Sequence, residues 1–135
     1  MSIIVKVIIN KPIDFVWEYW TNPIHIMQWN QASADWHCPN AVNDCTVGGK
    51  FSYTMAAKDG SISFDFWGVY DTVEIYKAIE YTLGDERKVN VEFSEVEGGT
   101  QIIETFDPES VNPEEMQKMG WQLILDSMKS YCESH

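Results

Sequence analysis

The segment from residue 35 to residue 112 constrains the fold of this chain more than any other. It shows no helical periodicity, and turn signals interrupt it five times, at Pro39-Asn40, Gly48-Gly49, Asp59-Gly60, Gly84-Asp85 and Gly98-Gly99. Between the turns, large apolar residues alternate with polar ones, which is typical of strands with one buried face. Short alternating runs spaced roughly ten residues apart predict an antiparallel meander.

Each predicted strand of the meander has one apolar face. The alternating apolar residues are Phe51, Tyr53 and Met55; Ile62, Phe64 and Phe66; Ile79, Tyr81 and Leu83; Val89, Val91 and Phe93. A further strand over residues 100–106 places Ile102 and Phe106 on one face, together with Glu104. A sheet that is apolar on one side needs another element to cover that side.

The C-terminal segment 112–133 is predicted to form the helix that covers the sheet. Asn112 is predicted to cap it, Pro113 suits the first helical position, and Glu115 completes a capping box. The apolar arc of this helix spans well over half of its circumference. It comprises Met116, Met119, Trp121, Leu123, Ile124, Leu125, Met128, Tyr131 and Cys132. We therefore expect the rest of the protein to grip the helix on most of its sides.

A narrow polar stripe on the same helix is left for solvent. It consists of Lys118, Gln122, Asp126, Lys129 and Glu133. Gly120 and Ser127 lie within the apolar arc, where a core helix normally carries larger side chains. Because glycine costs about 1 kcal/mol relative to alanine inside a helix, Gly120 indicates either close approach of helix and sheet or room for a ligand.

The first thirty residues predict one strand followed by two short helices. The residues of segment 2–10 that share one face are Ile3, Val5, Val7 and Ile9. Apolar residues at helical spacing follow at Ile13, Val16, Trp17 and Trp20. Pro12 suits the first position of that helix, and Asn22 followed by Pro23 marks the start of a second one. No repeat or linker divides residues 1–135, so we expect a single domain.

The composition argues against several classes of partner. The chain carries 21 acidic and 9 basic residues, a net charge of −12, so phosphate backbones and anionic membrane surfaces repel it. We therefore expect no nucleic-acid partner and no membrane partner. The N-terminal segment lacks the blocks of a signal peptide, and three cysteines without a C-x-x-C pair fit a reducing compartment. The predicted location is the cytoplasm.

The sequence contains no familiar motif of catalysis or cofactor binding. A G-x-S-x-G elbow, an H-E-x-x-H pair and a P-loop are all missing. His37, Cys38, Asp44 and Cys45 are metal-ligand types, but their spacing matches no common zinc site, and a loop is the simpler interpretation. We predict no catalytic residue, no cofactor and no metal.

Several clusters of residues resemble those of a known family. The early ones are Lys11-Pro12-Ile13-Asp14-Phe15-Val16-Trp17, Asn22-Pro23 and Gln28-Trp29, and the central ones include Asp44–Phe51, Phe66-Trp67-Gly68 and Gly98-Gly99-Thr100. The final ones are Glu104-Thr105-Phe106-Asp107, Asn112–Gln117 and Gly120-Trp121-Gln122. Together they resemble an uncharacterised bacterial branch of the activator-of-heat-shock-chaperone-ATPase homologue (AHSA-like) family, within the START and birch-pollen-allergen superfamily.

The resemblance implies an α+β helix-grip fold. In it, an antiparallel curved sheet of about seven strands wraps on a long C-terminal helix, with two short helices after the first strand. A cavity between sheet and helix is expected. The residues predicted to bind a ligand there are Trp36, Phe51, Tyr53, Phe64, Phe66, Tyr81, Val91, Glu104, Gly120, Trp121 and Ile124. The alternative is that these side chains fill the core and leave no cavity.

Glu104 is the unusual member of this set, because strand alternation turns its carboxylate toward the apolar face. A buried carboxylate without a partner either becomes protonated or destabilises the fold. Glu104 therefore has to be paired, hydrated or functional, and its candidate partners are Arg87, His37 and Tyr53. The alternative is a position at a hydrated rim, or behind a β-bulge that turns it to solvent.

These observations predict a non-catalytic domain that binds an apolar or aromatic small molecule, lipid- or polyketide-like, between its sheet and its last helix. The first alternative is a protein-interaction module that resembles a chaperone-ATPase activator domain, with a chaperone or another protein as partner. The second is a cyclase-like enzyme, because the resemblance implies a fold whose enzymes build their sites from scattered cavity residues.

Overall fold

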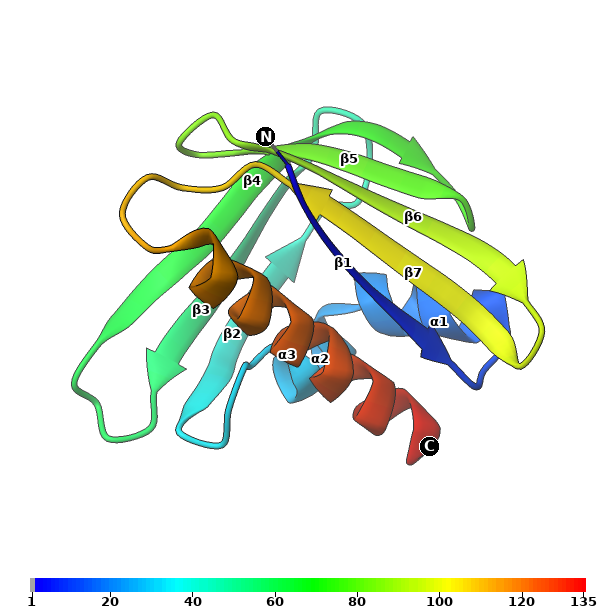
Figure 1. Cartoon of the computed structure of the whole chain (residues 1–135), viewed down its shortest axis with the longest axis horizontal. Coiled ribbons are helices and arrows are strands. Elements are labelled where there is room, and N and C mark those ends of the chain that lie inside the picture. The colour runs from blue at the N-terminus through cyan, green and yellow to red at the C-terminus, as the bar shows by residue number, and fades with distance from the viewer. Residues whose placement is uncertain (1) are drawn as a thin grey trace.

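The computed structural model describes residues 2–135, which form seven strands and three helices. In chain order they are β1 (Ile3–Ile9), α1 (Ile13–Thr21), α2 (Pro23–Trp29), β2 (Trp36–Asn43), β3 (Lys50–Ala57), β4 (Ser63–Glu74), β5 (Ala78–Leu83), β6 (Lys88–Val96), β7 (Gly99–Phe106) and α3 (Glu114–Glu133). The predicted α+β helix-grip fold is confirmed (Figure 1). Within these residues, no helix has the length and apolar character needed to cross a membrane.

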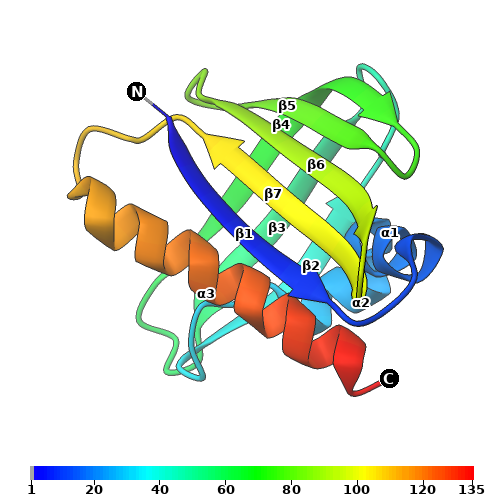
Figure 2. The same ribbon diagram turned by 45° about the vertical axis from the view of Figure 1, so that its right-hand side comes forward.

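All the strands join one antiparallel sheet in the order β1-β7-β6-β5-β4-β3-β2. β2 to β7 therefore follow one another as a meander, as predicted, and β1 pairs beside β7. The sheet curls, α3 runs along the edge strand β1, and α1 and α2 lie together at one end (Figures 1 and 2). The concave face of the sheet is thus enclosed by helices on two sides.

The N-terminal elements follow the sequence pattern closely. The buried residues of β1 are Ile3, Val5, Val7 and Ile9, as predicted. α2 begins at Pro23, and the side chain of Asn22 accepts a hydrogen bond from the backbone N–H of Ile24 at 3.0 Å. α1 begins one residue later than predicted, because Pro12 has an extended backbone with φ −67° and ψ 158°.

Strand β2 corrects the interpretation of its residues as a loop. It pairs with β3 along its length, with a shift of register between His37 and Asn40. Pro39 lies within this shift. Proline is tolerated there because β2 is the edge strand of the sheet, so its missing N–H deprives no second neighbour of a hydrogen bond. The Pro39-Asn40 signal therefore marks an irregular strand rather than a chain reversal.

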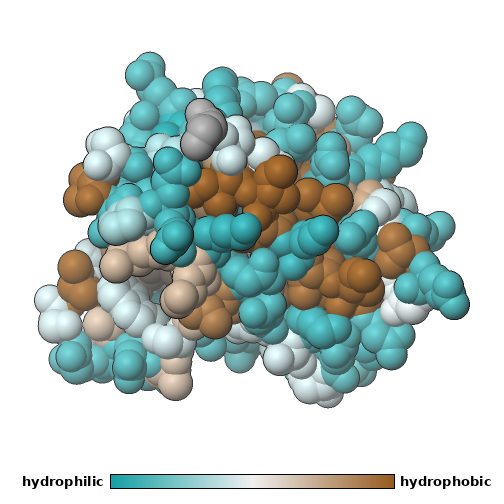
Figure 3. Space-filling model, in the orientation of Figure 1, coloured by the Kyte–Doolittle hydropathy of each residue, from teal (hydrophilic) through white to brown (hydrophobic). Residues whose placement is uncertain are grey.

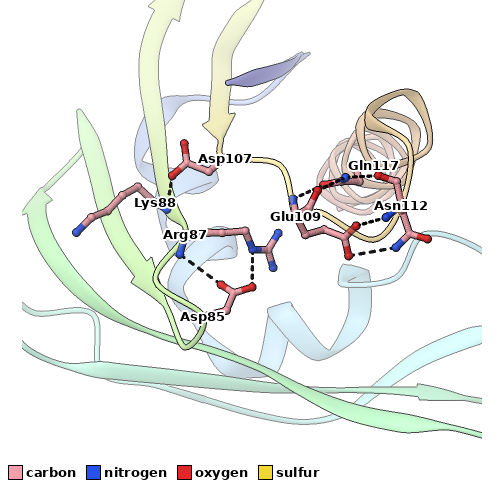
Figure 4. A network of polar contacts seen from close by, with 7 residues as sticks. All are labelled: Asp85, Arg87, Lys88, Asp107, Glu109, Asn112 and Gln117. Carbon is pink, nitrogen blue, oxygen red and sulfur yellow. Dashed lines mark hydrogen bonds and ion pairs between the residues drawn. The ribbon is translucent and has the colours of Figure 1, made fainter. Parts of the chain in front are cut away.

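The start of α3 also differs from the prediction, because Asn112 is not its cap. Pro113 holds the cap position without a side-chain hydrogen bond, and Asn112 Nδ2 donates instead to Glu109 Oε2 at 3.1 Å. Gln117 organises this turn: its Nε2 donates to the carbonyl oxygens of Glu109 and Asn112 at 3.1 and 2.8 Å. Its Oε1 accepts from the backbone N–H of Glu109 at 2.9 Å (Figure 4). The predicted capping box is wrong.

The polar stripe of α3 turns partly toward the sheet, which corrects the prediction that it faces solvent. Gln122 Nε2 donates to the carbonyl oxygen of Lys6 at 2.9 Å, and its Oε1 accepts from the Lys6 backbone N–H at 3.3 Å. Further along this edge, Lys129 Nζ donates to the carbonyl oxygen of Ile8, and Glu133 Oε2 accepts from the backbone N–H of Asn10. These side chains occupy the positions that a further strand would take, so they protect the edge of β1 from pairing with another chain.

The buried surface of α3 is narrower than predicted. Its buried residues are Gln117, Leu125, Met128 and Cys132. Met116, Met119 and Leu123 are 60, 65 and 41% exposed, because the helix lies along one edge of the sheet and is not surrounded (Figure 2). Apolar side chains also gather over β1 on the face that α3 borders (Figure 3), where Ile4 and Ile8 are exposed.

The contact between α3 and β1 can be tested with Gln122→Ala. This change removes both hydrogen bonds to Lys6, and we expect it to lower the free energy of unfolding by about 0.5–1.5 kcal/mol in urea denaturation. Lys118→Ala is the matched control, because Lys118 lies on the same stripe, is exposed and makes no hydrogen bond within the described residues. Equal effects of the two substitutions would contradict a specific role for Gln122.

Gly120 fits neither of its two predicted roles. A Cβ atom placed on it would meet nothing within 4 Å, so the prediction of close approach to the sheet is wrong. Gly120 also does not line the cavity described below.

We therefore expect Gly120→Ala to stabilise the protein by about 1 kcal/mol in thermal or urea unfolding, because alanine favours the helix and has space. A loss of stability would indicate that the helix packs more closely here.

Candidate functional site

A cavity of about 180 Å³ lies between the concave face of the sheet and α3 and is partly open to solvent. Its lining consists of Trp20, Trp29, Asn30, Phe51, Tyr53, Met55, Phe64, Phe66, Tyr70, Tyr81, Glu104, Trp121 and Ile124. In Figure 3 the surface is hollowed between α3 and strands β3 and β4. Phe64 is 50% exposed on β4, which places it at the mouth of the cavity.

The structure brings eight of the eleven predicted site residues together around this cavity. They are Phe51, Tyr53, Phe64, Phe66, Tyr81, Glu104, Trp121 and Ile124. Trp36 does not line the cavity, and its ring meets the ring of Phe64 edge-on with centroids 6.1 Å apart. Val91 is fully buried in the core beside Ile79, its register partner on β5. Gly120 is the third predicted residue outside the lining.

Five lining residues were not predicted: Trp20, Trp29, Asn30, Met55 and Tyr70. Met55 and Tyr70 continue alternations that the sequence displays, since Met55 follows Phe51 and Tyr53, and Tyr70 follows Phe66 and Gly68. Trp20, Trp29 and Asn30 come from the two short helices and their end. Helical spacing predicts that these helices pack inward, but it does not indicate which cavity their tryptophans reach.

Aromatic rings pack tightly at the closed side of the cavity. Trp121 of α3 stacks on Phe106 with ring centroids 3.8 Å apart and meets Phe66 edge-on at 5.9 Å. Phe51 is 1% exposed and contacts the rings of several other lining residues. Gly68 makes this possible, because a Cβ there would lie 2.9 Å from the Phe51 ring. The walls are therefore fixed by aromatic packing.

Glu104 points into this aromatic surrounding, as strand alternation predicts. It pairs in regular register with Val5 of β1 and Val91 of β6, and it is 6% exposed. The alternative of a solvent-facing position behind a bulge is therefore wrong. Arg87 is not its partner, because Arg87 Nε donates to Asp85 Oδ2 at 2.7 Å in the β5–β6 turn (Figure 4).

The carboxyl of Glu104 has no hydrogen-bond partner within the described residues, and neither His37 nor Tyr53 supplies one. Among these residues, no fully enclosed side-chain nitrogen or oxygen lacks a partner, so the carboxyl oxygens keep contact with the cavity space. Burial raises the pKa of Glu104 to about 8. At neutral pH the carboxyl is therefore mainly protonated and can donate or accept.

Three tyrosines surround the carboxyl with neutral hydroxyl groups. Burial raises the pKa of Tyr53, Tyr70 and Tyr81 above the ordinary value, and the negative charge of Glu104 adds to this for Tyr81. The Tyr70 hydroxyl donates to Asn43 Oδ1 at 2.5 Å, which ties it to the end of β2. Tyr81 has no such partner within the described residues, so its hydroxyl is available to a ligand.

The cysteines and histidines do not assemble into a metal site in the described part of the chain, where no group of three or more His, Cys, Asp or Glu side chains is placed to hold an ion. Cys38 is buried near Asn30, and burial raises the pKa of its thiol. His25 contacts the Tyr131 hydroxyl at 2.9 Å and stacks on Tyr19 at 3.8 Å, so it serves the packing of α1, α2 and α3.

The sequence profile of the family described as "Activator of Hsp90 ATPase homolog 1-like protein" matches residues 10–133. The chain belongs to this family. The resemblance found in the sequence motifs is thereby confirmed, and the AHSA1-like assignment covers every element from α1 to α3.

Solved structures agree with the AHSA1-like assignment. The solution structure of the AHSA1-like protein from Aeromonas hydrophila is 42% identical, covers 99% of this chain and 93% of its own, and superposes with a TM-score of 0.93. Chr148 from Cytophaga hutchinsonii is 53% identical over 98% of this chain and 91% of its own, with a TM-score of 0.82. The crystal structure of CV1439 from Chromobacterium violaceum shares the fold at 18% identity, with 98% of each chain covered and a TM-score of 0.87.

No curated protein matches the chain. The AHSA1-like family and its fold support a ligand-binding or interaction domain in general. The chemistry of the ligand has to be argued from the cavity itself.

Proposed function

We propose that this AHSA1-like domain binds a small aromatic molecule in the cavity between its sheet and α3, without transforming it. The observation that carries the proposal is the cavity lining, in which nine aromatic side chains surround a space of about 180 Å³ that solvent can enter. Aromatic walls with a few polar groups are typical of small-molecule sites. The set of eight predicted residues in the lining supports the same interpretation.

The volume of the cavity supports a ligand of one or two rings. A cavity of roughly 150 Å³ is large enough to bind benzene, whereas drug-sized ligands occupy about 300 Å³ or more. A whole lipid or polyketide would therefore have to displace lining side chains. Burying about 200 Å² of apolar ligand surface contributes roughly 5 kcal/mol, and association entropy subtracts part of this. We expect dissociation constants on the order of 1 mM for simple probes.

Titration calorimetry with toluene, benzyl alcohol and indole tests the proposal. Ile124→Trp is expected to weaken binding at least tenfold, because Ile124 lines the cavity and the larger indole side chain would fill it. Leu123→Trp is the matched control, since Leu123 neighbours it on α3 but is exposed and does not line the cavity. Absence of binding by all probes, or equal loss in both variants, would contradict the proposal.

The two alternative functions stay predictions. A protein-interaction module, with a chaperone or another protein as partner, is compatible with the exposed Met116, Met119 and Leu123 on α3. A cyclase-like enzyme would need groups that act on a substrate, and Glu104 and Tyr81 are the lining residues with open hydrogen-bonding positions. The cavity favours the small-molecule proposal over both.

A further inference from the structure

The cavity lining contains one carboxyl group and no basic group. Among the described residues that line it, Glu104 is the single acidic side chain, and lysine, arginine and histidine are absent. Glu104 is 94% shielded from solvent and has no hydrogen-bond partner within the described chain. Buried polar groups normally have such partners, so a carboxyl that lacks one and faces an accessible cavity is suited to a hydrogen-bond donor on a ligand.

The groups around Glu104 add hydrogen-bond acceptors but no competing positive charge. Its register partners on β1 and β6 are valines, and α3 contributes Trp121 and Ile124 to the cavity. The titratable groups on which the charge of Glu104 acts are the phenols of Tyr81 on β5 and Tyr53 on β3. Both stay neutral because burial raises their pKa values. Tyr70 of β4 is neutral for the same reason.

Arg87, whose positive charge affects the pKa of Tyr81, does not line the cavity. It lies in the β5–β6 turn, where its guanidinium Nε is 2.7 Å from Asp85 Oδ2. An anionic ligand would therefore find no cation inside the cavity and would meet a carboxyl group instead. Such a ligand would lose its hydration without a positive charge to compensate for it.

A cationic aromatic ligand would find partners for both of its parts. The faces of Trp, Tyr and Phe rings attract an ammonium group, and a carboxylate strengthens this with a charge-assisted hydrogen bond. Building on the proposed function, we propose that the cavity selects small aromatic amines, bound as their cations with the ammonium group at Glu104 and the ring between the aromatic walls. Tyr81 lines the same cavity and is affected by the charge of Glu104, so its hydroxyl oxygen can accept a second hydrogen bond from the ammonium group.

This selectivity predicts a coupling between ligand binding and proton release. With a pKa of about 8, Glu104 is ionised in about one molecule in ten at pH 7. An ammonium ligand pairs with the ionised form, so its binding releases close to one proton per site at pH 7. Its affinity should therefore rise roughly tenfold per pH unit as the pH increases toward 8, and level off above that pH.

The test compares four probes of similar size: benzylamine as the cation, benzyl alcohol and benzamide as neutral molecules, and benzoate as the anion. Calorimetric titrations of the full chain between pH 6 and pH 8.5, in two buffers with different ionisation enthalpies, measure both affinity and proton release. We expect benzylamine to bind at least tenfold more tightly than benzyl alcohol at pH 8, and benzoate to bind most weakly.

Two variants separate binding at Glu104 from attraction by the acidic surface. Glu104→Gln should reduce benzylamine to the affinity of benzyl alcohol and abolish proton release. Glu92→Gln makes the same charge change at an exposed position of β6 that lies outside the lining, and it should alter neither. Equal loss of affinity in both variants would indicate surface attraction and overturn the inference.

The outcomes for the two proposals differ. If the neutral probes bind and benzylamine binds no better, selection of amines is wrong while the aromatic cavity remains functional. Tighter binding of benzamide or benzoate would overturn the amine inference in the same way. If none of the four probes binds, the proposed function itself fails.

Discussion

Replacing Glu104 by glutamine is expected to remove most of the loss of stability that the protein suffers between pH 5 and pH 7.5. The folded-state pKa of Glu104 is raised to about 8 from an ordinary value of 4.5. Below the ordinary value both folded and unfolded forms are protonated, so burial of this side chain carries no ionisation cost. As the pH rises, the unfolded chain ionises and the folded chain does not, so stability falls until the pH passes the folded pKa.

The expected size of this effect makes it measurable by urea denaturation. At about 1.4 kcal/mol per unit of pKa difference, the free energy of unfolding contributed by Glu104 falls by on the order of 3 kcal/mol over this pH range. Glu104→Gln should therefore become more stable than the wild-type protein as the pH rises. Glu92→Gln serves again as the exposed control and should follow the wild-type profile. Parallel profiles for all three proteins would contradict an unpaired, buried Glu104.

Phe51→Ala is expected to lower the free energy of unfolding by about 3–5 kcal/mol, measured in the same denaturation experiment. Phe51 is 1% exposed, and its ring lies 4.8 Å from that of Tyr81 and 4.9 Å from that of Tyr53. Removing it opens a void beneath Gly68, which has no side chain to fill the space. The closed side of the cavity would thus lose its central support.

Phe64→Ala provides the matched comparison, because it deletes the same atoms from another lining residue. Phe64 is 50% exposed at the mouth of the cavity, so we expect a loss of about 1 kcal/mol or less. A cost similar to that of Phe51→Ala would mean that the mouth is part of the core, and the division of the cavity into a fixed wall and an open mouth would be wrong.

Much of the cavity could be predicted because period-2 alternation decides which face of a strand each side chain occupies. Phe51, Tyr53 and Tyr81 belong to such alternations, and the same rule turned Glu104 inward despite its charge. Trp36, which does not line the cavity, belongs to none of the alternations in the sequence. Its strand β2 has a shift of register between His37 and Asn40, where Pro39 is accommodated at a sheet edge, and local sequence does not reveal this.

The remaining differences arise from contacts between distant parts of the chain. Gln122 and Lys6 are 116 positions apart, and nothing in the polar stripe of α3 indicates that it bonds to an edge strand. Gln117 likewise replaces a predicted cap by bonding to backbone in the preceding loop. Trp20 and Trp29 reach the cavity only because α1 and α2 close one end of the sheet. Hydrophobic periodicity describes one element at a time and carries none of these relations.

The most direct test of an aromatic-binding cavity is the measurement of intermolecular nuclear Overhauser effects between toluene and the protein in solution. The expected result is contact between the toluene methyl protons and ring protons of Phe51, Tyr81 and Trp121, which all line the cavity. Contacts confined to Met116 and Met119, which are exposed on α3, or no contact at millimolar toluene, would contradict ligand binding between the sheet and the last helix.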